Sequence, residues 1–178
     1  MSMINELLSY YPMINDALKK ENRQALKSLS IDYHPPFVER IYFDIGDKRM
    51  NLHRMHPCSP EDALMHPHPW PSAVSVLSGS YEMSVGFSED ETEPKDTMKF
   101  ILSKGSHYEM ENVNSWHSVA PIVYPSLSVM LTGKPNDRPI KVKPQNKLRE
   151  LTDDEFYSLI NDFREVFRLT NKELSVIY

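Results

Sequence analysis

The sequence predicts a mainly β protein, built as a single antiparallel barrel with N-terminal helices and a C-terminal helix. Between Val38 and Leu131, apolar residues recur at every second position in short segments such as VERIYFDI, YEMSVGF and SLSVML. This alternation is typical of strands with one buried face. On either side, apolar residues recur about every 3.6 residues, as in amphipathic helices. Short strands separated by turn residues favour an antiparallel sandwich or barrel.

The length of 178 residues fits one domain with a full core. We expect a single domain over residues 1–178, with a helical N-terminal extension at 1–30, the barrel at 38–142 and the C-terminal helix at 152–168. Residues 2–29 are predicted to be helical, with Pro12 separating a short first helix from a longer second one. Their apolar stripe is formed by Ile14, Leu18, Ala25, Leu26 and Leu29.

The segments that link and follow the strands have their own signatures. The acidic run SEDETEPKDT at 88–97 is expected at the tip of a long hairpin, as a solvated surface. The proline-rich stretch at 133–147 is expected to wrap over the barrel. Thr152 and Glu155 then form a capping box at the start of the last helix. We expect the apolar stripe of this helix to dock on the barrel, through Phe156, Leu159, Ile160, Phe163, Val166 and Phe167.

Composition disfavours several functional classes. The net charge is −5, and no basic patch of the kind that binds a phosphate backbone is evident, so we expect no nucleic-acid partner. No apolar run approaches the roughly 20 residues of a membrane span. The N-terminus does not resemble a signal peptide, and the single cysteine, Cys58, fits a reducing compartment. We therefore expect a soluble cytoplasmic protein with no membrane partner.

Two histidines stand two residues apart in the run LMHPHPWPSAVSVLSG. In an extended segment, His66 and His68 point to the same face. Pro67 and Pro69 hold the backbone extended and disfavour helix before them. The pair therefore predicts half of a metal site, although an exposed histidine-proline loop would show the same letters.

A third histidine completes a pattern that resembles the cupin superfamily. The first cupin motif is HxH, then Glu after three or four residues, then Gly six residues later; here His66 and His68 are followed by Ser72 and Gly79. In the run GSHYEMENVNSWHSVAP, His117 occupies the ligand position of the second motif, where Asn112 and Asn114 replace the usual Pro and Gly. The resemblance covers roughly residues 38–142 and implies a double-stranded β-helix, or jelly-roll, barrel.

The resemblance also implies a type of metal site. Ser72 replaces the glutamate ligand, which leaves three neutral imidazoles and open coordination positions. We expect Ser72 itself to face the metal side, because it shares strand parity with the histidines. Imidazole suits Fe, Zn, Cu and Ni. Cupins that lack the glutamate are similar to Fe(II)-dependent dioxygenases such as cysteine dioxygenase, so Fe(II) is favoured as the one divalent ion, with Zn and Ni as further candidates.

The resemblance to cysteine dioxygenase implies a substrate-binding role for one further residue. This chain also departs from that family at three positions. An arginine on an early strand holds the substrate carboxylate in that family, and Arg40 in VERIYF matches its place. Of the Ser-His-Tyr network, Ser128 is present, but Met130 and Thr132 replace the other two. The crosslinking cysteine is also missing. We therefore expect no efficient oxidation of cysteine.

Other residues near the motifs are candidate contributors to the site. Tyr81 and Tyr108 are candidates to donate hydrogen bonds to substrate or oxygen. Trp70 and Trp116 could line a pocket or only pack. His53 and Arg54 should point to opposite faces, so one of them faces the barrel interior. His53, His56 and His107 are interpreted as structural or surface histidines.

The sequence leaves three functions open. The first is a mononuclear metal-dependent oxygenase, dioxygenase-like, acting on a small polar or anionic molecule. The second is a non-catalytic cupin that binds a small molecule or metal as a sensor or structural module. The third is a metal-dependent isomerase or lyase with Tyr81, Tyr108 or Glu82 as the base. Cupins commonly pair through barrel edges, so we also expect a homodimer.

Overall fold

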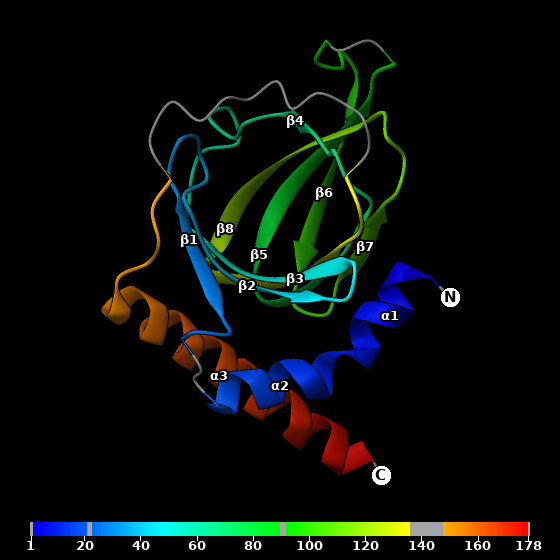
Figure 1. Ribbon diagram of the computed structural model, residues 1–178. Helices are drawn as coiled ribbons and strands as arrows, with labels where there is room; N and C mark the ends of the chain where they lie inside the picture. The colour runs from blue at the N-terminus through cyan, green and yellow to red at the C-terminus, as the bar shows by residue number, and fades with distance from the viewer. Residues whose placement is uncertain (1, 21–22, 90–91, 136–147, 178) are drawn as a thin grey trace.

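The computed structural model describes residues 2–20, 23–89, 92–135 and 148–177, with side chains described up to residue 168. It is a mainly β structure in which strands curve around a central space and three helices lie together on one side (Figure 1). This confirms the predicted fold class: a cupin-like barrel with N-terminal helices and a C-terminal helix.

The N-terminal extension begins with two helices, α1 (Met3–Ser9) and α2 (Tyr11–Lys20). The side chain of Ser2 caps α1 by accepting a hydrogen bond from the backbone N–H of Asn5. Pro12 lies in the first turn of α2, where a missing N–H costs little, and the two helices are separate as predicted.

The prediction of helix up to residue 29 was wrong at its end. Residues Lys27–Ile31 form a strand, β1, which pairs antiparallel with β2 (Val38–Ile45). Leu29 fits a helical stripe, but it also lies in the alternating run KSLSI. Here, pairing with a neighbouring strand overrides the local pattern.

The strands after β2 form one continuous sheet. They are β3 (Lys48–Met55), β4 (His66–Pro67), β5 (Ser72–Phe87), β6 (Thr97–Ser103), β7 (His107–Met110) and β8 (Ser115–Thr132). The strand order is β1-β2-β3-β8-β5-β6, with β4 also paired to β8 and β7 to β5. All of the pairings are antiparallel.

Two of these strands are longer than the short segments predicted. The runs AVSVLSG and YEMSVGF both belong to β5, which passes through a register irregularity between Val76 and Tyr81. Gly79 lies in this irregularity with φ of 71°, and a Cβ there would stand 2.3 Å from the carbonyl oxygen of Val123. Only glycine fits so close to the neighbouring backbone.

The two ends of β8 have different neighbours. Residues 126–132 lie between β3 and β5, whereas residues 115–117 lie between β5 and β4. The strand thus runs from one wall of the barrel to the other. Its N-terminal part, at Trp116 and His117, pairs with β4.

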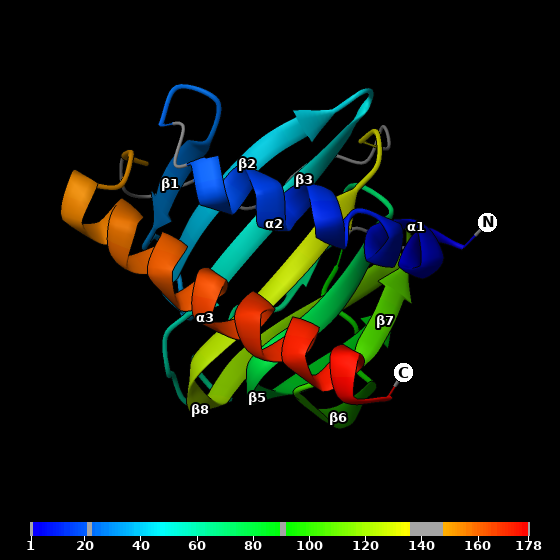
Figure 2. The same ribbon diagram turned by 90° about the horizontal axis from the view of Figure 1, so that it is seen from below.

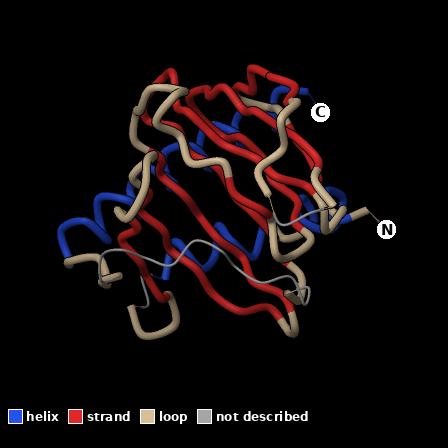
Figure 3. The backbone as a smooth tube through the Cα atoms, turned by 90° about the horizontal axis from the view of Figure 1, so that it is seen from above, coloured by secondary structure: helices blue, strands red, loops and turns tan. Residues whose placement is uncertain are grey.

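The sheet separates two apolar cores. Side chains on its outer face, among them Ile41, Leu52 and Leu127, pack against the helices. Seen from below in Figure 2, α2 and α3 (Asp153–Ile177) lie across the strands, and in Figure 3 the helices lie behind the sheet. The inner face carries a smaller cluster, formed by Met55, Val76, Tyr81, Met83 and Val119.

The C-terminal helix confirms its predicted cap and docking. Glu155 N–H donates to Thr152 Oγ1 at 3.3 Å, and Thr152 N–H donates to Glu155 Oε2 at 2.8 Å. The predicted stripe is buried except for Val166, which is partly buried, and Phe156 and Phe163 are fully inaccessible. The helix continues past residue 168, to Ile177.

Two predicted connections are described only in part. The run 88–97 does join β5 and β6 in a long hairpin, of which residues 90–91 lie outside the described part. Residues 136–147 of the stretch expected to wrap over the barrel also lie outside it. In the part of the chain that the structure describes, no helix is long and apolar enough to cross a membrane.

Candidate metal centre

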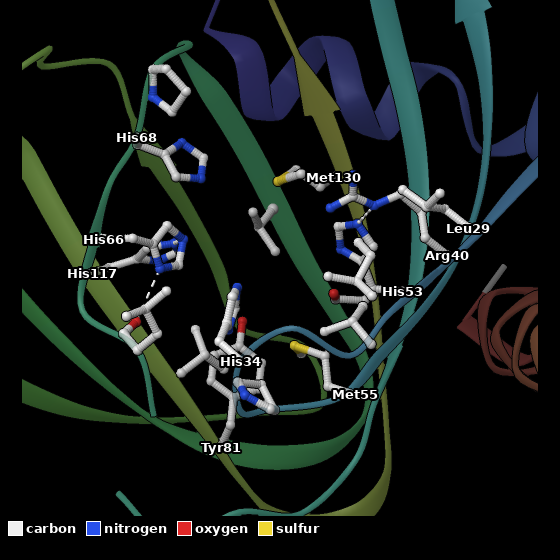
Figure 4. Close-up of a pocket in the computed structure, with 18 of the residues that line it drawn as sticks. Leu29, His34, Arg40, His53, Met55, His66, His68, Tyr81, His117 and Met130 are labelled. Atoms are coloured by element: carbon white, nitrogen blue, oxygen red, sulfur yellow. Dashed lines mark hydrogen bonds between the residues drawn. The ribbon is translucent and has the colours of Figure 1, made fainter. Parts of the chain in front are cut away.

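Three histidines meet inside the barrel, as predicted. His66 lies on β4 directly opposite His117 on β8, and His68 follows two residues after His66. The ring nitrogens that the three side chains offer all lie within 4.8 Å of one another. Figure 4 shows the three rings side by side at one wall of the pocket.

The local sequence fixes the segment that carries two of these histidines. Pro67 and Pro69 restrict the backbone on both sides of His68. The segment is also held to β8, because the backbone N–H of His68 donates to the carbonyl of Ser115 at 3.2 Å. His66 and His68 are therefore placed by backbone pairing with the strand that carries His117.

Backbone carbonyls set the proton position on two of the rings. His66 Nδ1 lies 3.0 Å from the carbonyl oxygen of Leu64, and His68 Nδ1 lies 3.1 Å from that of Trp70. A carbonyl oxygen can only accept a hydrogen bond, so each Nδ1 carries the proton. Each Nε2 therefore presents a lone pair. Metal-ligating histidines are commonly oriented in this way.

The donor set fits a divalent transition metal. His117 Nε2 lies 3.2 Å from His66 Nε2. Two nitrogens bound to one metal at about 2.0–2.1 Å are separated by about 2.9–3.4 Å. His117 Nδ1 is buried without a hydrogen-bond partner among the described residues. A proton on Nε2 would leave Nδ1 without a donor, and a proton on Nδ1 would leave the Nε2 lone pair facing that of His66. A metal ion between the Nε2 atoms removes that opposition.

Burial keeps these imidazoles neutral. It lowers the pKa of His66 and of His68 to about 4 and that of His117 well below the usual value. A backbone acceptor opposes this shift at His66 and His68 but does not outweigh it. Neutral imidazole is the form that binds metal ions.

Contrary to the prediction from strand parity, the side chain of Ser72 does not point to the metal side. Its side chain is fully buried and points to His68, but its hydroxyl lies 3.1 Å from Nδ1, the nitrogen away from the ligand atom. Ser72 does not line the pocket. The turn from Trp70 to Pro71 separates β4 from β5, so the simple alternation of sides does not carry over from His68 to Ser72. Ser72 is thus a second acceptor for His68 Nδ1, beside the carbonyl of Trp70.

The histidines form one wall of a cavity of about 270 Å³. Arg40, Tyr81 and Tyr108, the three predicted substrate contacts, all line it. So do His53, Trp70, Ser128 and Met130. The cavity therefore brings together the three predicted metal ligands and the three predicted substrate contacts.

Arg40 faces the histidines from the opposite wall (Figure 4). Its Nε donates to Nε2 of His53 at 2.8 Å. Among the described residues no carboxylate pairs with it, and burial lowers the pKa of the guanidinium to about 10. It remains charged at neutral pH, so the cavity holds a cation that no carboxylate of the described residues neutralises.

His53 and Arg54 point to opposite faces, as expected from strand parity. His53 faces the cavity, and burial first, then Arg40, lowers its pKa well below the usual value. Arg54 faces the helices, where it donates to Glu39 at 2.6 and 2.8 Å and to Asp162 at 2.6 Å.

The two tyrosines form a buried pair of hydroxyls deep in the cavity. Tyr81 Oη lies 3.4 Å from Tyr108 Oη. Burial raises the pKa of Tyr108 to about 12 and that of Tyr81 well above its usual value. Both are therefore hydrogen-bond donors at neutral pH, not bases. Glu82, the other base considered, lies outside the cavity and pairs with Lys99 at 2.8 Å.

The remaining histidines separate clearly. His56 pairs with Glu39 at 2.7 Å and His107 is exposed, so neither lines the cavity. His34 does line it, with its ring centroid 5.9 Å from that of His66. Sequence reasoning missed His34, because it lies in a loop where no periodicity indicates direction. Trp116 is buried outside the cavity lining.

No family model and no curated protein sequence matches this chain. Among solved structures, it is similar to hydroxypropylphosphonic acid epoxidase from S. wedmorenis, with 15% identity, 62% of this chain and 56% of the other covered, and a TM-score of 0.48. Streptomyces albus HEPD with 2-hydroxyethylphosphonate and Fe(II) bound has 11% identity, 57% and 22% coverage and a TM-score of 0.44. KdgF from Halomonas sp. has 18% identity, 61% and 89% coverage and a TM-score of 0.44.

The chain thus spans about half the length of the first of these structures and under a quarter of the second. All three have TM-scores below 0.5.

Proposed function

We propose that this chain is a mononuclear metal-dependent oxygenase, dioxygenase-like, whose one divalent ion is held by His66, His68 and His117. The observation that carries the proposal is the convergence of three neutral imidazoles, two with Nε2 lone pairs fixed by backbone carbonyls, on one wall of a buried cavity. An ion held by three protein ligands would keep coordination positions open for substrate and dioxygen.

Fe(II) is the favoured ion, with Zn and Ni as alternatives. Imidazole alone does not choose among these metals. A ferrous ion supplies redox chemistry with dioxygen. The three histidines carry no charge, so the bound ion keeps its full positive charge and favours an anionic substrate.

The cavity residues supply binding and orientation for a small polar or anionic molecule. Arg40 is placed to bind an acidic group, since its guanidinium is charged and has no carboxylate partner among the described residues. A planar guanidinium binds carboxylates through two parallel hydrogen bonds. Tyr81 donates its hydroxyl proton to Tyr108, which leaves Tyr108 to donate to a bound molecule, with Tyr81 holding it in place. Met130 lines the cavity without supplying an imidazole or phenol, so cysteine is not the expected substrate.

Metal content and oxygen uptake test the proposal together. We expect about one Fe(II), Zn or Ni ion per chain after reconstitution, measured by elemental analysis. His66→Ala and His117→Ala should lose most of it, whereas His107→Ala, at an exposed position outside the cavity, should retain it. No retained metal after reconstitution would overturn the proposal.

The iron-loaded protein should also consume oxygen with a member of a panel of small carboxylic acids. Consumption should be lost in His66→Ala and in the zinc-loaded protein. Metal bound at full stoichiometry with no oxygen uptake across the panel would instead favour a non-catalytic binding module.

A further inference from the structure

The cavity is apolar between its two polar walls. The histidines occupy one wall, Arg40 and His53 the other, and the side chains between them are mostly hydrocarbon (Figure 4). These apolar lining residues include Leu29, Val38, Met55, Val74, Val119 and Met130. Ligand sites that combine apolar walls with a few placed polar groups bind molecules of matching character.

The volume sets the size of the occupant. The cavity of about 270 Å³ lies just below the range of roughly 300–1,000 Å³ usual for ligand pockets. It equals the liquid volume of about nine water molecules at roughly 30 Å³ each. A molecule of about ten non-hydrogen atoms fits this space, which is larger than the smallest metabolic acids require.

Arg40 supplies the charged end of the cavity. Its Nε is occupied, because it donates to Nε2 of His53 at 2.8 Å. Among the described residues no carboxylate pairs with the guanidinium. An acidic group is therefore the ligand chemistry that this end of the cavity favours.

We infer that the molecule bound here is an amphiphilic acid. Its acidic group lies at Arg40, its apolar body contacts the hydrocarbon walls, and its far end faces the histidines; the whole molecule has about ten non-hydrogen atoms. The last element rests on the proposed function, whereas the first two rest on the cavity alone. A fully polar molecule would leave the apolar walls without matching contacts.

Three probes test the two independent elements. 3-Phenylpropanoate has the acid and an apolar body, propanoate has the acid alone, and 3-phenylpropan-1-ol has the apolar body alone. Binding to the full chain is followed by calorimetry, first without metal and then with Zn(II), which supports no oxygen chemistry. We expect 3-phenylpropanoate to bind at least tenfold more tightly than either other probe, in both forms. If propanoate binds as tightly as 3-phenylpropanoate, the ligand needs no apolar body. If 3-phenylpropan-1-ol binds as tightly, the ligand needs no acidic group. Either result would overturn the inference.

A matched pair of variants locates the binding. Leu29→Trp fills the cavity beside Arg40 and should weaken both 3-phenylpropanoate and propanoate, the former at least tenfold. Ile101→Trp, at a position 63% exposed on β6, should leave both affinities unchanged. Equal effects of the two variants would overturn the location. If Leu29→Trp does not fold, the comparison of probes on the unmodified chain still decides the inference.

Metal content, measured on the same samples, separates this inference from the proposed function. Tight 3-phenylpropanoate binding without any retained metal would support the amphiphilic ligand and overturn the oxygenase. Retained metal with no preference for 3-phenylpropanoate would support the metal site of the proposed oxygenase and overturn the amphiphilic ligand.

Discussion

The hydroxyl of Ser72 has a different task from the carboxylate that the resembling family carries at this position. It lies 3.1 Å from His68 Nδ1, where it shares the proton with the carbonyl of Trp70. A second acceptor on a ligating histidine holds the ring in place and raises the basicity of its other nitrogen. Ser72 is thus a positioning residue for the proposed metal site.

Removing this hydroxyl should weaken metal binding without abolishing it. Loss of an acceptor behind a ligand typically costs 10–100-fold in metal affinity, and since Trp70 still accepts from His68, we expect Ser72→Ala to cost about tenfold. Competition with a chelator of known affinity measures the change. Ser84→Ala, on the same strand and outside the cavity, is the control. An unchanged affinity would show that the carbonyl of Trp70 is sufficient.

The strand β5 depends on one glycine at its irregularity. A Cβ at Gly79 would lie 2.3 Å from Val123 O and 2.6 Å from Pro125 O, both backbone atoms that cannot move aside cheaply. Gly105 has a similar positive φ, 89° against 71°, but has nothing within 4 Å of such a Cβ. The two positions therefore separate steric clash from backbone strain.

We expect Gly105→Ala to lower the free energy of unfolding by about 1–2 kcal/mol, the cost of a side chain at positive φ. Gly79→Ala should cost roughly 3 kcal/mol or more, because the strand must also move. Denaturant unfolding of both variants measures the difference. Similar losses in the two variants would mean that β5 can shift away from β8 at little cost.

A buried ion cluster connects the helix α3 to the barrel. Arg54 on β3 pairs with Glu39 on β2 and with Asp162 on α3, and the Glu39 side chain is only 4% exposed. Burial alone would raise the pKa of Glu39, but its hydrogen bonds to Arg54 and His56 outweigh burial and hold the pKa below the usual value. The cluster therefore stabilises the fold while Glu39 is ionised.

Glu39→Gln should lower the free energy of unfolding by about 2–4 kcal/mol at pH 7, since it leaves Arg54 buried with one carboxylate instead of two. Because the folded-state pKa is depressed, the contribution of Glu39 is present above its unfolded pKa of about 4.3 and is lost as pH falls through the lower folded value. The difference between the two proteins should therefore shrink below pH 4.

Denaturant unfolding at several pH values measures this difference. Glu82→Gln, which breaks the more exposed pair with Lys99, should cost less than about 1 kcal/mol. A difference between wild type and Glu39→Gln that stays constant down to pH 3 would contradict the assignment.

Helices and strands were predictable where the spacing of apolar residues fitted only one type of secondary structure. Alternation in VERIYFDI places Arg40 on the inner face and Ile41 on the outer one, as observed. The end of the N-terminal region was not predictable, because Leu29 satisfies both a helical and an alternating pattern. Nor was the direction of Ser72, because the prolines around Trp70 interrupt the alternation on which its prediction depended. His34 lies in a loop, where only the folded chain shows which way it points.

Over the whole molecule, metal binding should stabilise the fold. The three histidines come from β4, β8 and the segment between β4 and β5, so the unfolded chain does not hold them together. An ion that binds only the folded state adds about 2.7 kcal/mol at a free concentration one hundred times its dissociation constant. We expect Zn(II) to raise the thermal midpoint by several degrees and a chelator to reverse this. His117→Ala should remove the effect, and a shift retained in that variant would place the ion elsewhere.

The position of β8 also has a consequence for the order of events during synthesis. This strand fills the gap between β3 and β5 and also pairs with β4, yet it ends only at Thr132. A nascent chain that has emerged from the ribosome only as far as β7 has its first three strands in place but cannot join them to β5. His66 and His68 then have no third partner. If the proposed ion binds only where all three histidines meet, its delivery follows the emergence of β8.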